Sequence, residues 1–579
     1  GPERALVDVN SEHPGGTRAI DWWFPSDDGA RLAYGISEDG SEESTLRVRD
    51  VASGRDLPDV IPRTRACSLA WMPDGGGFYY TRYPRPGEVP AGEEPYHRAV
   101  FHHRLGDDPG RDAKLFGDGR DRTDWPNLDL SPDGRWLAIA VSQGWSKSEL
   151  WLLDRAGAGA PPVAVAAGEQ ARFDIVEVRN DRLYVQTTSG APRGRILAVD
   201  PHAPQRANWR DIVPAGEDVV QQAVYFQGGL AVASLHDAAA RLRLFADDGT
   251  ARGEVPLPGL GALTGLTGAR DAPELHFGFA GFFAPTTVFH VVPGHAPTVW
   301  RALPSPVDPA AFEVERVIVT SRDGTRLPLF LAHRKGLARD GSRPTVLYGY
   351  GGFAIDMLPT WTPSAIPFLE RGGVYAVAVL RGGGEYGEDW HRAGMLDKKQ
   401  NVFDDFIAAA SWLVDHRVTR PQELAISGGS NGGLLVGAAL TQRPDLFRAV
   451  VCKVPLLDML RYHKFRIGAL WIPEYGSPDD PVAARWLAAY SPYQHVRDGV
   501  AYPAVFLQTA ESDTRVDPMH ARKMAARLQA AQRGDHPVLL DVQSRAGHGA
   551  GKPVDKVIAE AVDTWSFVFA QLAMKESKP

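Results

Sequence analysis

The feature that most constrains the fold is a change of sequence rhythm near residue 305 of this 579-residue chain. Before that point an Asp-Gly pair recurs at Asp28-Gly29, Asp74-Gly75 and Asp133-Gly134, each followed by aromatic or branched residues. Asp-Gly suits turns that require a positive φ, and such flanks suit short strands. The spacing is about that of a propeller blade with insertions. We therefore predict an all-β propeller of about six units over residues 1–305, with a pair of β-sandwiches as the alternative.

A second domain is predicted after a boundary marked by Pro304, Pro306 and Pro309. From there strand-like and helix-like segments alternate, which indicates a mostly parallel, doubly wound sheet in an α/β-hydrolase domain, residues 309–579. The predicted strands are 317–320, 345–348, 374–379, 424–427, 504–509 and 538–542, and the predicted helices are 404–415, 433–442, 518–532 and 554–572.

The segment around Ser430 predicts a nucleophile. A strand-like run, 424–427, leads into Gly428-Gly429-Ser430-Asn431-Gly432 and then into an apolar helix. This is Gly-x-Ser-x-Gly in the strand–turn–helix setting of a nucleophile elbow. The following helix places free N–H groups beside developing negative charge. The alternative is a glycine-rich turn with an ordinary serine.

A serine hydroxyl needs a base and an orienting carboxylate, and hydrolases of this type carry them in the order Ser, Asp or Glu, His. His548 lies in a glycine-rich loop after the last predicted strand, so we assign it as the base; the alternative is a surface-loop histidine. Glu511, Asp513 and Asp517 follow strand 504–509. Asp517 precedes Pro518 and is expected to cap a helix. We prefer Asp513 over Glu511, and all three chosen residues then follow the carboxyl ends of strands.

Five motifs together resemble the prolyl oligopeptidase family of serine peptidases, and the resemblance extends over essentially the whole chain. They are 348–353 (YGYGGF), 381–387 (RGGGEYG), 428–433 (GGSNGG), 513–516 (DTRV) and 546–553 (AGHGAGKP). The resemblance implies a Ser430–Asp513–His548 triad. It also implies an oxyanion hole made by the Tyr350 hydroxyl and the backbone N–H of Asn431, and a propeller that caps the site and excludes folded proteins.

The resemblance also implies a proline pocket. Trp471 is the indole on which the proline ring stacks, Phe353, Tyr475 and Val516 are further walls, and Arg515 holds a substrate carbonyl. Aromatic, uncharged walls suit a rigid apolar ring without an N–H. Without the resemblance Trp471 is more typical of a core residue, Tyr350 of a strand end, and Arg515 of an ion pair with Asp513 or Asp517.

The chain departs from the family pattern in three places. The resemblance implies an N-terminal stretch, with helices packed on the hydrolase and strands of the first blade, and we expect this chain to begin after it; a count of six units against the family's seven blades fits that expectation. Around the carboxylate, Glu511-Ser512-Asp513 replaces a more acidic run, and Ile472-Pro473 follows Trp471.

The predicted function is hydrolysis of short peptides after proline. Alternatives are cleavage after Arg or Lys, release of acylated residues, or an inert propeller scaffold. No metal or organic cofactor is implied. The chain has two cysteines, Cys67 and Cys452, which are too few and too far apart for a disulfide framework. The net charge is −8 and basic residues are not clustered, which argues against a protein that binds nucleic acid. No apolar run approaches the roughly 18 residues that are needed to span a bilayer. We expect a cytoplasmic monomer. The chain opens Gly-Pro-Glu-Arg, without Met and without a visible signal peptide, and it reads as a chain entered partway. Since the true N-terminus is then not visible, a periplasmic or secreted protein is the alternative.

Overall fold

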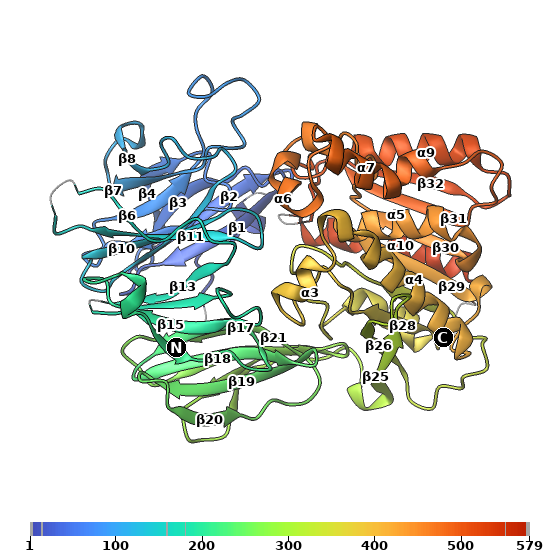
Figure 1. Ribbon diagram of the computed structural model, residues 1–579, viewed down its shortest axis with the longest axis horizontal. Coiled ribbons are helices and arrows are strands. Elements are labelled where there is room, and N and C mark those ends of the chain that lie inside the picture. Colours follow the sequence, from blue (N-terminus) through green and yellow to red (C-terminus); the bar gives the residue numbers. More distant parts are fainter. Residues whose placement is uncertain (1–3, 13–15, 158–159, 180, 550–551, 575–579) are drawn as a thin grey trace.

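The computed structural model describes residues 4–12, 16–157, 160–179, 181–549 and 552–574. Two lobes lie side by side, an all-β lobe from the first half of the chain and an α/β lobe from the second (Figure 1). Residues 1–3, 13–15, 158, 159 and 180 of the predicted propeller, and residues 550, 551 and 575–579 of the predicted hydrolase domain, lie outside the described residues.

The all-β lobe is a propeller of six four-stranded antiparallel sheets in the described chain, preceded by the short helix α1 (Val9–Glu12). The first three blades are β1 (Arg18–Pro25), β2 (Arg31–Glu38), β3 (Thr45–Asp50), β4 (Arg55–Ile61); β5 (Leu69–Trp71), β6 (Gly77–Arg82), β7 (Ala99–Arg104), β8 (Ala113–Phe116); β9 (Trp125–Leu130), β10 (Trp136–Ser142), β11 (Ser148–Asp154), β12 (Val163–Ala166). The others are β13 (Phe173–Val178), β14 (Leu183–Thr187), β15 (Arg195–Val199), β16 (Arg210–Val213); β17 (Val219–Phe226), β18 (Gly229–His236), β19 (Ala239–Ala246), β20 (Ala251–Val255); β21 (Ala262–Gly268), β22 (Leu275–Gly281), β23 (Ala284–Val291), β24 (Thr298–Arg301).

The Asp-Gly pairs occupy the same place in the first three blades. Each forms the turn between the first and second strand, and Gly29, Gly75 and Gly134 have φ of 67°, 65° and 71°. A residue with a Cβ seldom adopts this conformation, so the glycines allow the tight turn. The predicted six-unit propeller is confirmed, whereas the predicted loss of part of a first blade stays a prediction.

The α/β lobe contains one eight-stranded sheet in the order β25-β26-β28-β27-β29-β30-β31-β32. The first two strands pair antiparallel, and the six strands from β28 to β32 pair parallel. The strands are β25 (Phe312–Thr320), β26 (Arg326–Arg334), β27 (Thr345–Tyr348), β28 (Val374–Ala378), β29 (Leu424–Gly429), β30 (Ala449–Lys453), β31 (Ala504–Ala510) and β32 (Val538–Gln543).

Helices cover both faces of this sheet, so that side chains pointing to either side of a strand are buried. On β27, Leu347 packs in a core with α4, α5 and α9, and Val346 packs in a second core with α2 and α10. The helices are α2 (Ile366–Glu370), α3 (Glu388–Arg392), α4 (Gln400–Asp415), α5 (Asn431–Gln442), α6 (Ile472–Tyr475), α7 (Pro481–Tyr490), α8 (Pro492–His495), α9 (Met519–Ala531) and α10 (Val554–Gln571).

The α/β prediction is therefore confirmed, and every predicted strand and helix overlaps an observed one. The sequence patterns missed β26, β30, α7 and the shorter helices α2, α3, α6 and α8. Residues 327–332 of β26 are a continuous apolar run buried in the sheet, without the alternation used to recognise the other strands.

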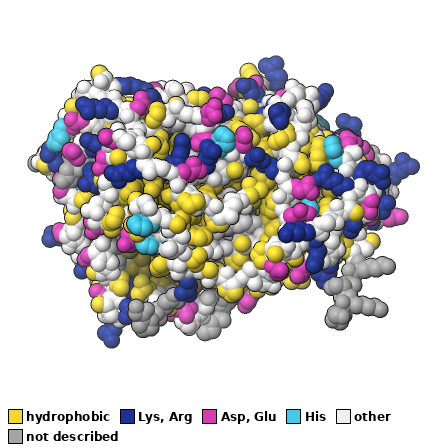
Figure 2. Space-filling view, turned by 90° about the horizontal axis from the view of Figure 1, so that it is seen from below, with side chains coloured by type: hydrophobic (Ala, Val, Ile, Leu, Met, Phe, Trp, Pro, Cys, Tyr) yellow, Lys and Arg dark blue, Asp and Glu magenta, His cyan; other side chains and the backbone are white. Residues whose placement is uncertain are grey.

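On the face shown in Figure 2, acidic and basic side chains are interspersed around a broad apolar middle. This agrees with the absence of clustered positive charge in the sequence. Among the described helices, none is long and apolar enough to span a membrane.

Candidate active site

Ser430 lies at a sharp bend between β29 and α5. Its backbone has φ 58° and ψ −118°, its N–H donates to the Lys453 carbonyl at 2.9 Å, and its carbonyl accepts from Leu434 at 3.1 Å. The left-handed φ is costly for a residue with a side chain, and such strain is held only where the surroundings fix it. The bend exposes the serine side chain at the start of the helix, as a nucleophile elbow requires.

The flanking glycines are required by close backbone contacts. A Cβ on Gly428 would lie 2.2 Å from the Gly432 carbonyl oxygen, and a Cβ on Gly432 would lie 2.8 Å from the Gly349 carbonyl oxygen. Both distances are far below a normal contact. The Gly-x-Ser-x-Gly pattern therefore reflects the space available at the bend.

Asp513 and His548 are joined as the sequence predicts. Asp513 is fully buried after β31, and its Oδ2 accepts from His548 Nδ1 at 2.7 Å. Its Oδ1 accepts from the backbone N–H groups of Arg515 and Val516 at 2.9 and 2.8 Å. Glu511, the alternative carboxylate, is exposed. The carboxylate is thus fixed at both oxygens and presents one of them to the imidazole.

The structure does not join His548 to Ser430 by a hydrogen bond in the described chain. Such bonds are often long in the absence of substrate and tighten when the substrate binds. Ser430 instead has the Tyr350 phenol as a side-chain neighbour: burial raises the pKa of Tyr350, and a hydrogen bond with the Ser430 side chain opposes that rise. A phenol that stays protonated at neutral pH can donate to an oxyanion.

Asn431 ties the start of α5 to the loop that carries Tyr350. Its Nδ2 donates to the Tyr350 carbonyl at 2.6 Å, and its Oδ1 accepts from the Tyr475 hydroxyl at 2.8 Å. The N–H groups of the first helical turn have no partner within a helix, and they lie at its positive end. The predicted oxyanion donors, Tyr350 and Asn431, therefore lie on adjoining backbone.

The predicted pocket residues share one buried apolar cluster. Phe353, Trp471, Tyr475 and Val516 are all less than 10% exposed in that cluster. The Phe353 and Tyr475 rings meet edge to face with centroids 5.5 Å apart. Since Tyr475 also bonds Asn431, these walls lie beside the predicted nucleophile.

A cavity of about 470 Å³ between the lobes continues from this cluster. Trp471, Leu470 and Arg515 line it from the α/β lobe, and Trp125 and Trp145 line it from the propeller. The Trp145 ring meets Phe353 edge to face at 4.5 Å. A larger cavity of about 840 Å³ contains none of the predicted site residues. The propeller thus contributes aromatic walls that the sequence did not indicate.

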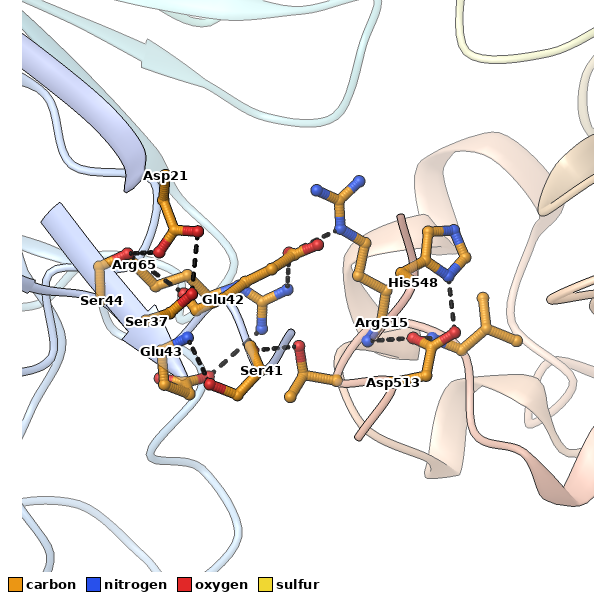
Figure 3. A network of polar contacts seen from close by, with 12 residues as sticks. Asp21, Ser37, Ser41, Glu42, Glu43, Ser44, Arg65, Asp513, Arg515 and His548 are labelled. Carbon is orange, nitrogen blue, oxygen red and sulfur yellow. Dashed lines mark hydrogen bonds and ion pairs between the residues drawn. The ribbon is translucent and has the colours of Figure 1, made fainter. Parts of the chain in front are cut away.

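Arg515 pairs with the propeller. Its Nε donates to Glu42 at 2.8 Å, and Glu42 also accepts from Arg65 at 3.1 Å (Figure 3). The alternatives of an Asp513 or Asp517 side-chain pair are not seen in the described residues. Asp517 instead pairs with Arg466 at 3.3 Å, and it accepts from the Met519 N–H at 2.9 Å at the start of α9, as expected of a capping residue.

The loop that carries Glu42, between β2 and β3, contacts both the aspartate and the histidine segments. Thr514 Oγ1 donates to the Ser41 carbonyl at 2.9 Å, and a Cβ on Gly547 would lie only 1.7 Å from the Gly40 carbonyl oxygen. Asp21 fixes the far end of the loop by accepting from Ser44 (Figure 3). The candidate site therefore lies at the contact between the two lobes.

Comparison with known proteins agrees with this architecture. Residues 1–297 match the model of the prolyl oligopeptidase N-terminal beta-propeller domain, and residues 360–575 match that of the prolyl oligopeptidase family. The prolyl endopeptidase of Elizabethkingia miricola is 32% identical over all of this chain and 82% of its own length. The chain belongs to the prolyl oligopeptidase family.

Other family members show the same likeness. Prolyl oligopeptidase A of Galerina marginata is 32% identical over 98% of this chain and 81% of its own. A structure from an analysis of two prolyl endopeptidases has a TM-score of 0.96, with 42% identity over 99% of this chain and 85% of that one. Prolyl oligopeptidase B of Galerina marginata, bound to a 35-residue hydrolysis and macrocyclization substrate, has a TM-score of 0.92 at 28% identity, covering 98% and 82%.

Sequence reasoning missed the propeller contributions, Glu42 and Trp145, and three buried charged residues behind the pocket, His391, Lys399 and Glu474. For the propeller residues no local signal exists, since their partners are more than 200 residues away. Glu474 does carry a signal, because an acid between Trp471 and Tyr475 stands in a buried apolar segment.

Proposed function

We propose that this protein is a serine endopeptidase that hydrolyses short peptides on the carboxyl side of proline. The observation that carries the proposal is the Asp513–His548 hydrogen bond at the same inter-lobe contact as the strained Ser430 elbow and an aromatic recess. The family's curated relatives named prolyl endopeptidase support the same substrate class.

In the proposed mechanism His548 takes the proton of Ser430 as the hydroxyl attacks the carbonyl carbon of the substrate proline. Asp513 keeps His548 in the tautomer whose Nδ1–H points to the carboxylate, so that Nε2 is the basic nitrogen. The Tyr350 hydroxyl and the Asn431 N–H donate to the oxyanion, each typically worth 10²–10³ in rate. His548 then returns the proton to the leaving amine, and water releases the acyl group by the reverse sequence.

Proline is favoured over Arg or Lys because the acids near the recess are already paired. Glu474 accepts from the Phe353 N–H at 3.0 Å and pairs with His391 at 2.8 Å, and Glu42 pairs with Arg65 at 3.1 Å. A basic substrate side chain would have to displace one of these partners. The aromatic walls, by contrast, accept a pyrrolidine ring without any change.

Matched short substrates that differ only in Pro or Arg before the scissile bond test this proposal. We expect kcat/KM to favour Pro, and a preference for Arg would overturn the pocket assignment. Labelling with a fluorophosphonate tests the inert-scaffold alternative, since we expect an adduct at Ser430. Ser430→Ala is expected to lower kcat by about 10⁶.

We further propose that Arg515 leaves Glu42 to bind a substrate carbonyl, because Arg515 lies on the wall of the cavity. Residues 305–309 are proposed to divide the two domains, because they lie in the gap between β24 and β25. We also propose, from the sequence alone, that the protein acts as a cytoplasmic monomer, with a periplasmic or secreted location as the alternative.

A further inference from the structure

A buried group of charged side chains lies directly behind the recess and takes no part in the proposed mechanism. Glu474 on α6, His391 on α3 and Lys399 before α4 are each at most 1% exposed. His391 Nε2 lies 2.8 Å from Glu474, and Lys399 Nζ lies 3.5 Å from the other Glu474 oxygen. Charges are not buried together without cost, and the pairing here offsets that cost.

This group also bonds the backbone of the loop that carries Tyr350. Glu474 Oε1 accepts from the Phe353 N–H at 3.0 Å, and Lys399 Nζ donates to the Gly351 carbonyl at 2.9 Å. The loop is strained at Phe353 and Ala354, which have φ of 60° and 53°. Strained backbone persists only where its surroundings hold it. The two bonds hold the backbone at Phe353 and at Gly351 just before it, where they oppose relaxation of the strained residues.

The same group is connected to the propeller through α3, which lies on the edge of the α/β lobe that faces the blades (Figure 1). Ser146, between β10 and β11, places its Oγ 3.1 Å from His391 Nδ1. The Glu388 N–H donates to the Pro192 carbonyl at 2.7 Å, and Arg392 donates to the Gln170 carbonyl at 3.0 Å. Three propeller loops therefore hold the helix that carries His391.

We propose that Glu474, His391 and Lys399 are positioning residues that hold the Tyr350 loop in its oxyanion-binding conformation, and that α3 makes this positioning depend on the docked propeller. The inference deepens the proposed function and rests on it, since it assigns no contact with substrate. A shift of the loop moves the Tyr350 hydroxyl relative to Ser430, and displacements of about 1 Å in such groups cost about 10² in rate.

The charges of the group favour this fixed arrangement. Burial would lower the pKa of His391, but the neighbouring carboxylates of Glu388 and Glu474 raise it to about 9, so at neutral pH the imidazolium donates from Nδ1 to Ser146 and from Nε2 to Glu474. Burial would raise the pKa of Glu474, but His391 and Lys399 keep it below the ordinary value. Glu474 therefore stays an anion that accepts from Phe353.

Lys399→Met tests the inference, with the neighbouring exposed Lys398→Met as the matched control. We expect Lys399→Met to lower kcat on a proline peptide about 10- to 100-fold with little change in KM, because the lost interaction acts in the transition state. Lys398→Met is expected to keep the kcat of the parent chain. If Lys399→Met fails to fold, Glu474→Gln replaces it, with the same expected split between kcat and KM.

An unchanged kcat in the folded variant overturns the positioning role, and so does a loss confined to KM. Ser146→Ala tests the link to the propeller: we expect kcat to fall about fivefold, since one hydrogen bond is lost. An unchanged kcat there overturns the dependence on the docked propeller. A parent chain that fails to cleave proline peptides contradicts the proposed function itself, which these variants leave untouched.

Discussion

Ser430 is held in a conformation that costs a serine on the order of 1–3 kcal/mol. Its φ of 58° is maintained by backbone bonds to Lys453 and Leu434 on either side of the bend. At the same scale, Asp513 is fixed by two N–H groups before it meets His548. Ser430 and Asp513 are thus positioned by backbone bonds, and His548 is oriented by the Asp513 side chain.

Asp513→Asn is expected to lower kcat by about 10⁴, because the amide favours the wrong imidazole tautomer while the packing is kept. Glu511→Gln, two residues away and exposed, is the control and is expected to leave kcat unchanged. Steady-state kinetics on a proline peptide measure both. If Glu511→Gln abolished turnover and Asp513→Asn were silent, Glu511 would be the carboxylate.

At the scale of single elements, the strand–bend–helix unit of β29 and α5 depends on close backbone approach. Gly428 and Gly429 are neighbours in this bend, but only Gly428 faces the carbonyl of Gly432. Identical substitutions at the two positions therefore separate a requirement for space from a requirement for flexibility.

Gly428→Ala is expected to lower the melting temperature and to cost activity, since its Cβ would lie 2.2 Å from a backbone oxygen. Gly429→Ala has its nearest neighbour at 3.6 Å, an ordinary contact, and is expected to fold as the parent chain does. Thermal unfolding measures the difference. Equal destabilisation by both substitutions would show that the bend is limited by flexibility.

Helix α3 is expected to make stability depend on pH through His391. The groups that face His391 are Glu388, Glu474 and Ser146, with Lys399 beyond Glu474. Its pKa is raised to about 9. The stabilisation is therefore complete below about pH 6.5, which is the pKa of histidine in the unfolded chain. It is lost as the pH rises through 9, the pKa in the folded chain.

We expect the melting temperature to fall between pH 6.5 and pH 9.5, and to fall less in His391→Gln, whose side chain does not titrate. The difference corresponds to a loss on the order of 3 kcal/mol. Unfolding curves at several pH values measure it. Parallel pH dependence in the two proteins would show that His391 is not protonated in the folded state.

At the scale of the whole molecule, one side chain connects four blades. Arg270, between β21 and β22, lies 2.6 Å from Glu177 on β13, 3.2 Å from Asp129 on β9 and 3.9 Å from Asp27 in the β1–β2 turn. Burial raises the pKa of Glu177 to about 7, and the Arg270 charge opposes this rise. Blade six is thus joined to blades one, three and four.

Arg270→Met is expected to destabilise the propeller by on the order of 1–3 kcal/mol, since it leaves buried carboxyl groups without their cation. Arg252→Met, on exposed β20, is the control and is expected to be neutral. Denaturant unfolding measures the change. The kcat of folded Arg270→Met is expected to match the parent chain, and an unaltered unfolding midpoint would contradict the connecting role.

Much of this molecule follows from patterns that extend over a few residues. Asp-Gly pairs predicted three blade turns, and the segment 424–442 predicted the bend at Ser430, because both depend on local backbone sterics. The buried strand β26 was missed because a continuous apolar run has no helical or strand periodicity. Asp513 and His548 were chosen from their order in the chain and their loop contexts, and both then follow the carboxyl ends of predicted strands, which meet at one edge of a parallel sheet.

The sequence by itself determined the two domain types and the sharp bend at Ser430. It also predicted Asp513 and His548, which follow strand ends, as the partners of Ser430. Only the tertiary structure decided that Glu42 meets Arg515, that Trp145 meets Phe353, and that Ser146 meets His391. These pairs join the two lobes, and the sequence spacing between their members, 473 residues for Glu42 and Arg515, carries no local preference that a pattern could show. Local conformation is set by neighbouring residues, whereas contacts between lobes are set by the shape and charge of whole surfaces.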